Sequence, residues 1–203
     1  ADCLVALHAR RSHAAIRAWR DRHPARPALV VLTGTDLYRD LADDADARDS
    51  LAIADRLIVL QDEGIRALPM EYRRKARVVY QSAPALQPSS KAQARLNCVF
   101  VGHLREEKDP LTAMRAWTEM PAEMPAYLSM VGDALDPALA AAARALAMQE
   151  PRFRWLGARP HGWTRQAIKR AHLLLVCSRM EGGANVIGEA ATWGTPVLAS
   201  RVP

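Results

Sequence analysis

LLLVCSRMEGGANVIGEA, residues 173–190, is the stretch that decides the fold. Its first five residues form an unbroken apolar run, which is typical of a strand buried on both faces. Two glycines follow, and from Asn185 onward apolar residues recur at helical spacing. A buried strand, a glycine-rich loop and a helix in this order predict a parallel α/β unit. In such a unit ligands bind beyond the carboxyl ends of the strands.

The same alternation of strand and helix runs along the whole chain and predicts two Rossmann-like domains. We expect strands at 3–7, 28–33, 56–60 and 76–80, and then at 97–102, 126–132, 152–157, 173–178 and 195–200. Between these two sets lies a stretch rich in Pro, Ser and Ala without periodicity, which is typical of a linker. We therefore predict domains at 1–81 and 95–203, a linker at 82–94, and parallel sheets covered by helices and facing a cleft.

The sequence begins and stops within the predicted series of strands and helices. The chain opens on a strand without an initiator Met, and it stops just after another strand. We expect both domains to be partial.

Composition narrows the class of protein. Half of the 203 residues are apolar and a quarter are charged, which is the balance of a soluble globular protein. No apolar run reaches the roughly 18 residues that a membrane span needs. The net charge of +6 comes from basic residues scattered along the chain, which favours a small anionic substrate over a nucleic-acid partner. Cys3, Cys98 and Cys177 form neither a disulfide framework nor a zinc pattern, so we expect a reducing, cytoplasmic setting.

The glycine-rich loop carries residues suited to a nucleotide. Asn185 is a plausible N-cap, and the free amides of the following helical turn favour a phosphate. Glu189 lies one turn further on the same face, where its carboxylate suits a ribose diol. Glu181 could reach the hydroxyls of a sugar. The residues alone leave a second interpretation open, a glycine-rich turn with two solvated glutamates.

A family resemblance supports the first interpretation. SRMEGGANVIGEAATWGTPVLAS, residues 178–200, resembles the donor-binding signature of retaining glycosyltransferases of the family-4 type, the glycosyl transferases group 1. That family has two Rossmann-like domains in the GT-B architecture. The resemblance implies that Glu189 binds the ribose of a nucleotide sugar and that Glu181 contacts the transferred sugar as a catalytic residue. It also implies that the loop backbone faces the donor at Gly182, Gly183, Ala184, Asn185 and Val186.

A second segment agrees. VFVGHLREEKDP, residues 99–110, resembles the family's strand-Gly-Arg-Leu-x-x-x-Lys segment. This implies a donor site at Gly102 and a catalytic Lys108 that neutralises the diphosphate leaving group. His103 stands where the family has arginine, and either His103 or Arg105 would supply the second donor contact. Taken alone, Lys108 also fits a second interpretation, a surface lysine that precedes a helix.

The first half is expected to hold the acceptor. LVALHARRS (4–12) and VVLTGTDLYRDL (30–41) resemble the selenosugar synthases, which are similar to this family and transfer a UDP-linked sugar onto selenophosphate. The resemblance implies acceptor-binding roles for His8, Arg11, Ser12, Gly34, Thr35 and Asp36. The residues alone also allow an N-cap at Ser12, a helix cap at Asp36 and a structural His8.

The sequence therefore predicts transfer of a sugar from a UDP-sugar to selenophosphate. Two alternatives stay open: a family-4-type enzyme with a hydroxyl acceptor, and a UDP-sugar-binding protein without transfer activity. No metal cofactor is expected, because cations and helix amides would stabilise the leaving group in place of a metal. The remaining histidines, His13, His23, His161 and His172, are assigned no role.

Overall fold

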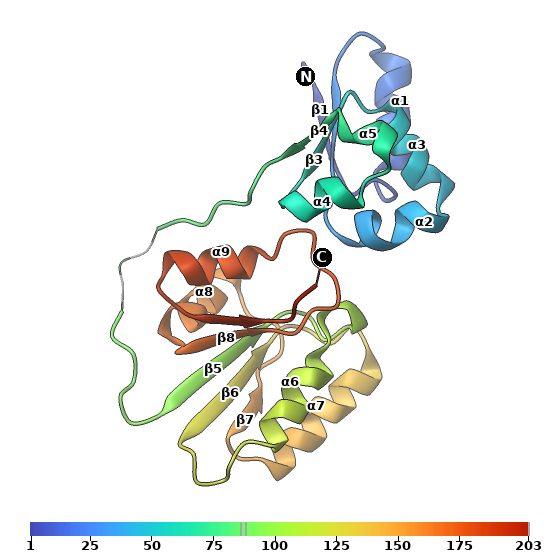
Figure 1. The fold of residues 1–203 in the computed structure, drawn as a ribbon. Helices are drawn as coiled ribbons and strands as arrows, with labels where there is room; N and C mark the ends of the chain where they lie inside the picture. Colours follow the sequence, from blue (N-terminus) through green and yellow to red (C-terminus); the bar gives the residue numbers. More distant parts are fainter. Residues whose placement is uncertain (86, 88, 203) are drawn as a thin grey trace. The chain divides into compact units, whose positions relative to one another are not determined.

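The computed structural model describes residues 1–85, 87 and 89–202; positions 86 and 88 of the predicted linker and position 203 lie outside the described residues. The chain divides into two compact units (Figure 1). The first unit contains Ala1–Gln81 together with Met180–Ala184, and the second contains Ser82–Arg179 together with Asn185–Val202.

The first unit is built on one parallel sheet in the order β1-β2-β3-β4. Its strands are short: β1 Leu4–Leu7, β2 Ala28–Val31, β3 Arg56–Val59 and β4 Ala76–Val78. The helices between them are α1 His13–Arg22, α2 Leu41–Asp43, α3 Ala45–Ile53, α4 Asp62–Ala67 and α5 Met70–Arg73. A turn of π-helix, Asp36–Asp40, leads into α2. The right-handed crossovers expected of parallel strands explain why a helical segment follows each of the first three strands.

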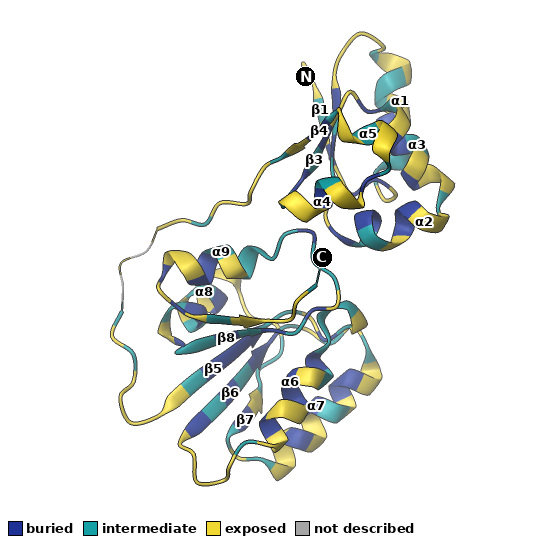
Figure 2. Cartoon of the chain, viewed as in Figure 1, coloured by how far each residue is buried: buried dark blue, intermediate teal, exposed yellow. Residues whose placement is uncertain are grey.

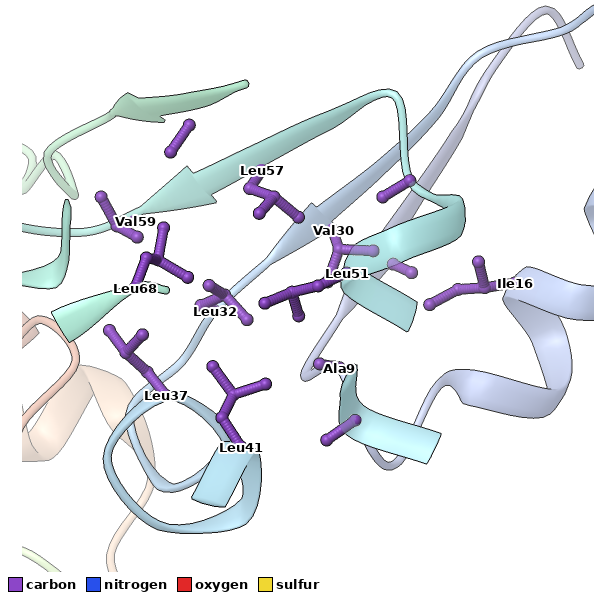
Figure 3. Packing of buried hydrophobic residues seen from close by; sticks show 14 residues of the cluster. Ala9, Ile16, Val30, Leu32, Leu37, Leu41, Leu51, Leu57, Val59 and Leu68 are labelled. Carbon is purple, nitrogen blue, oxygen red and sulfur yellow. The ribbon is translucent and has the colours of Figure 1, made fainter. Parts of the chain in front are cut away.

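The core of the first unit lies on one face of this sheet (Figure 3). Val30 of β2 and Leu57 and Val59 of β3 form one cluster with Ile16 of α1 and Leu51 of α3, and all five are fully buried. Within this cluster Val30 lies near Leu51, and Val59 lies near Leu68 (Figure 3). On the opposite face, Val5 and Leu7 of β1 are 55% and 62% exposed. Coverage of both faces was predicted, and among the described residues this sheet does not have it. Buried residues alternate with partly buried ones along β2, as expected of a strand that is covered on one face, whereas a strand covered on both faces would be buried continuously.

The second unit is a five-stranded parallel sheet in the order β7-β6-β5-β8-β9. Its strands are β5 Leu96–Val101, β6 Ala126–Val131, β7 Phe153–Trp155, β8 Leu173–Val176 and β9 Val197–Ala199. Its helices are α6 Pro110–Thr118, α7 Pro137–Gln149, α8 His161–Arg170 and α9 Asn185–Thr192. The chain extends from β5 to β7 on one side and from β8 to β9 on the other. The strand order therefore reverses between β5 and β8, where α/β sheets of this kind bind ligands.

Helices cover both faces of the second sheet, as predicted (Figure 2). Alternate residues of β5 divide between the two cores. Phe100 packs with Trp117 of α6 in one cluster, while Val99 packs with Ile168 of α8 and Trp193 in the other. The clearest helix signal in the sequence, Asp136-Pro137, begins α7 as expected: the Asp136 carboxylate accepts the backbone N–H of Ala138 at 2.8 Å.

The segment predicted as a linker is tied to the second unit at three described points. Trp193 Nε1 donates to the Pro84 carbonyl at 3.0 Å, and Lys91 Nζ donates to the Gly194 carbonyl at 3.2 Å. His172 hydrogen-bonds to the Ala92 carbonyl at 2.8 Å through Nε2. The described part of the chain contains no helix long and apolar enough to cross a membrane.

Candidate functional site

In the second unit, backbone hydrogen bonds join the loop after β5 to the loop after β6. Leu104 N–H donates to Asp133 O at 2.8 Å, and Leu135 N–H donates to Leu104 O at 3.1 Å. Gly132 has φ of +147°, and a Cβ there would lie 2.0 Å from the Gly102 carbonyl oxygen. Only glycine fits this approach, so Gly132 fixes the position of the turn that carries Gly102.

His103 occupies this turn in a defined orientation. It is exposed, and its Nδ1 accepts the backbone N–H of Asp133 at 3.1 Å. That bond places the proton of the neutral ring on Nε2, which is therefore available as a donor. A cavity of about 180 Å³ adjoins it, lined by Val101, Gly102, His103, Val131, Gly132, Ala158, Arg159 and Thr164. Apart from Thr164 of α8, these residues end or follow β5, β6 and β7, at the edge of the sheet where ligands are expected.

Lys108 ends a short 3₁₀ turn, Glu106–Lys108, directly before α6. A Cβ on Gly102 would meet Lys108 Cγ at 3.4 Å, so the lysine stem lies against the predicted Gly102 position. Arg105 lies 3.8 Å from Glu107 and directs its charge toward its own turn. The structure thus brings Gly102 and Lys108 together, as the donor-site prediction requires.

Arg179 is a cation at this edge that the sequence analysis did not single out. Its guanidinium lies 3.1 Å from Glu106 and 3.4 Å from Asp109, and its backbone N–H donates to the Glu107 carbonyl. Arg179 follows β8 and so links the loop after that strand to the turn after β5. In the sequence, the sign of such a role is that Arg179 directly follows the strand predicted at 173–178.

Glu189 lies on the second turn of α9 and is 2% exposed. Its Oε1 is 3.0 Å from Nε2 of His161, the first residue of α8. A carboxylate buried to this extent needs a hydrogen-bond partner, and His161 supplies one. No role for His161 was expected from the sequence. The signal was not visible in the sequence, because the two residues are 28 positions apart.

The glycines of the loop before α9 are explained by close backbone packing. Met180–Ala184 groups with the first unit. A Cβ on Gly182 would lie 2.4 Å from the carbonyl oxygen of Thr33, and one on Gly183 would lie 2.5 Å from Leu60 Cβ. Gln61 Nε2 also donates to the Glu181 carbonyl at 2.7 Å. The close approach that the glycines predict is therefore made, in this structure, to the chain's own residues. Ala184, Asn185 and Val186 are partly buried at the start of α9.

In the first unit, the predicted acceptor residues of β1 and β2 do meet. His8 Nε2 lies 3.0 Å from the Thr35 hydroxyl, and the His8 backbone has φ of +72°. Burial lowers the pKa of His8, opposed by Asp36 and reinforced by Arg11. Ser12 sits before α1 but does not cap it: its hydroxyl donates to the Leu7 carbonyl at 2.6 Å. The Arg11 side chain is exposed.

Asp36 is placed differently from an open acceptor-binding group. It is fully buried, and its carboxylate accepts the backbone N–H groups of Ala9, Thr33 and Gly34 at 2.8–2.9 Å. These bonds make Asp36 the group that orders the loops around His8. Asp40, which the sequence analysis did not single out, lies 3.8 Å from His8 Nε2 and 3.0 Å from Arg10 Nε.

A second cavity, of about 510 Å³, is lined by residues including Arg95, Asn97, Ser129 and Arg170. These lie toward the amino ends of β5 and β6, away from every predicted site residue. This cavity is larger than the one beside His103. We nevertheless place the ligand site beside His103, because parallel α/β sheets bind ligands at the carboxyl ends of their strands. No cluster of three potential metal-ligating His, Cys, Asp or Glu side chains occurs among the described residues.

Known structures are similar to the chain over nearly its whole length. HepE of Anabaena in complex with UDP and glucose has a TM-score of 0.77 at 18% identity, covering 99% of this chain and 59% of that one. The lipopolysaccharide outer core galactosyltransferase WaaB has a TM-score of 0.69 at 20% identity, covering 99% and 57%. The pneumococcal O-GlcNAc transferase GtfA, in complex with UDP and GlcNAc, has a TM-score of 0.72 at 18% identity, covering 92% and 40%. The chain thus spans less than two thirds of each.

The fold is therefore that of the glycosyltransferases with two parallel α/β units, and the predicted fold class is confirmed. Residues 95–203, more than half of the chain, match the family of glycosyl transferases group 1, and the chain belongs to that family. No curated protein sequence matches it.

Proposed function

We propose that the protein is a glycosyltransferase that uses a UDP-sugar as donor. The observation that carries this proposal is the buried carboxylate of Glu189, held on the second turn of α9 within the segment that matches the family. HepE and GtfA, whose folds are similar, are described in complex with UDP. Glu189 would accept hydrogen bonds from the ribose hydroxyls, and the amides of Asn185 and Val186 would face the diphosphate.

Lys108 and His103 would stabilise the leaving group. As the bond from the anomeric carbon to the diphosphate oxygen breaks, negative charge grows on UDP. Lys108 supplies a positive charge beside Gly102, and His103 Nε2 supplies a hydrogen-bond donor. Glu181 would contact the sugar that is transferred. No metal is assigned to this reaction, and that assignment remains a prediction.

For the acceptor we propose selenophosphate. The support is the resemblance of residues 4–12 and 30–41 to the selenosugar synthases, together with the meeting of His8 and Thr35 at the ends of β1 and β2. Selenium would attack the anomeric carbon as UDP leaves with the electron pair of the broken bond. Water would then cleave the selenium–phosphorus bond, releasing phosphate and a sugar selenol. A soft, strongly nucleophilic selenium needs no strong base from the protein.

One observation favours a hydroxyl acceptor as the second candidate. Asp40 Oδ2 is buried 3.8 Å from His8 Nε2, and among the described residues it forms an ion pair with Arg10 but no hydrogen bond of good geometry. A carboxylate in this position repels an anion but would orient a hydroxyl group. The charge of Arg10, 3.0 Å from Asp40, offsets part of that repulsion.

A transfer assay separates the two candidates. UDP release is followed with a panel of UDP-sugars, with selenophosphate, with simple sugar alcohols, and without acceptor, and products are weighed by mass spectrometry. Selenophosphate-dependent UDP release with a selenium-bearing sugar supports the selenosugar reaction. Release that depends only on hydroxyl acceptors contradicts it and supports the second candidate. Tight UDP binding without release under any condition indicates a binding protein instead.

A further inference from the structure

His161 of α8 contacts the predicted ribose-binding carboxylate of Glu189, and the two side chains differ greatly in their exposure to solvent. Nε2 of His161 lies 3.0 Å from Oε1 of Glu189. The Glu189 side chain is 3% exposed, whereas the His161 side chain is 69% exposed. Both residues belong to the second unit.

This asymmetry indicates which partner benefits from the contact. An ion pair or hydrogen bond made by an exposed side chain adds little to stability. A buried carboxylate, in contrast, is costly without a donor, and a hydrogen bond to one of its oxygens sets the orientation of the other. The Nε2–H of His161 fixes Oε1 of Glu189 and leaves the second oxygen to meet a ligand.

We propose that His161 is a positioning residue for the nucleotide's ribose, acting through Glu189. This inference rests on the proposed UDP-sugar site and adds to it a residue on a different helix. With Oε1 held by the imidazole, Glu189 presents a carboxylate oxygen in one orientation to the ribose diol. The expected consequence is selectivity for ribonucleotides, since a nucleotide without the diol gains nothing from this arrangement.

The test compares two probes and four proteins by calorimetric titration of the full chain. The probes are UDP and 2′,3′-dideoxy-UDP, which differ only in the diol. The proteins are the wild type, His161→Ala, His161→Gln and Gln166→Ala. Gln166 lies on the same helix, is exposed and lines the larger cavity at the opposite end of the sheet, so Gln166→Ala controls for changes to α8 itself.

We expect His161→Ala to weaken UDP binding about tenfold, which corresponds to about 1.4 kcal/mol. Binding of dideoxy-UDP should change less than twofold. The amide of glutamine can donate to Glu189, so His161→Gln should restore most of the lost affinity, and Gln166→Ala should bind both probes as the wild type does. In turnover assays the KM for the donor should rise in His161→Ala while kcat stays nearly constant.

Two results overturn the proposal while leaving the UDP-sugar site in place. One is an equal loss of UDP and dideoxy-UDP affinity in His161→Ala, which would show that His161 only supports the packing of α8 on α9. The other is unchanged UDP affinity in that variant. A wild type that binds neither probe contradicts the proposed donor site, and the role of His161 falls with it.

Discussion

Asp36 Oδ2 accepts the backbone N–H of Ala9 at 2.9 Å, so that one buried carboxylate joins the loops after β1 and β2. Its other oxygen accepts the N–H groups of Thr33 and Gly34. Such charge-assisted bonds to backbone amides are among the stronger hydrogen bonds in proteins.

Asp36→Ala should therefore destabilise the first unit by about 3 kcal/mol, because it leaves three buried or part-buried N–H groups without a partner. Native-state hydrogen exchange of the β1 and β2 amides measures the effect on this unit alone. Asp43→Ala, which removes an exposed aspartate of α2, is the matched control and should change exchange little. Unchanged exchange in Asp36→Ala would show that water or a rearranged loop satisfies these amides.

His8 should make the stability of the first unit depend on pH. Burial lowers the pKa of His8 below 6.5, against the attraction of Asp36 and Asp40 and together with the repulsion of Arg10 and Arg11. As the pH falls below about 6.5, the unfolded chain takes up the proton before the folded chain does. Stability is thus full above this pH and declines below it, down to the lowered pKa of the folded state.

The variant His8→Asn tests this origin, since asparagine tolerates the positive φ at this position. Urea denaturation at pH 7.5 and pH 5.5 should show a smaller loss of stability in the variant than in the wild type. An equal loss in both proteins would place the pH dependence on other groups.

Gly132→Ala should disturb the donor edge of the second unit. The new Cβ would overlap the Gly102 carbonyl oxygen, and the φ of +147° is unfavourable for alanine. We expect a loss of about 3 kcal/mol in the free energy of unfolding. Gly162→Ala is the control: Gly162 lies in the first turn of α8, and an added methyl group would meet no atom of the described residues within 4 Å, so alanine should stabilise by less than about 1 kcal/mol. Thermal unfolding of both variants measures these effects. Equal melting temperatures would contradict the predicted overlap between the new Cβ and the Gly102 carbonyl oxygen.

The three cysteines should differ in their reactivity toward thiol reagents. Cys3 is exposed, whereas burial raises the pKa of the Cys98 thiol, and burial with the nearby Asp109 raises the pKa of the Cys177 thiol. Since the thiolate is the reactive species, Cys3 should be alkylated first and Cys98 only on unfolding. Mass spectrometry after a timed maleimide pulse at pH 8 checks this order. Labelling of Cys98 at the rate of Cys3 would contradict the packing of β5.

Local sequence patterns predicted the alternation of elements well, because parallel strands and their crossover helices have different periodicities. The helix after Asp136-Pro137 and the turn around Gly102 lie where the sequence placed them, and the strand predicted at 173–178 is observed at Leu173–Val176. Coverage of the first sheet was not predictable in this way, since apolar residues such as Val5 and Leu7 look the same whether or not something packs on them.

The sequence predicted the residues of the site only where those residues lie close together along the chain. Gly102 and Lys108 share one turn, and Asn185 and Glu189 share one helix face. The partners Asp40, His161 and Arg179 are brought in from a different element or a different turn. Asp36 shows the limit most clearly: its position after β2 suggested a ligand group, yet the backbone amides around it take both of its oxygens.

The most direct test of the central claim is the affinity of the full chain for UDP, measured by calorimetry for the wild type, Glu189→Ala and Lys108→Ala. We expect saturable binding to the wild type and a loss of about tenfold to a hundredfold in each variant, because each removes a charged contact to the ribose or diphosphate. Wild-type binding that both variants retain in full would contradict the placement of the donor site at the carboxyl ends of β5 and β8.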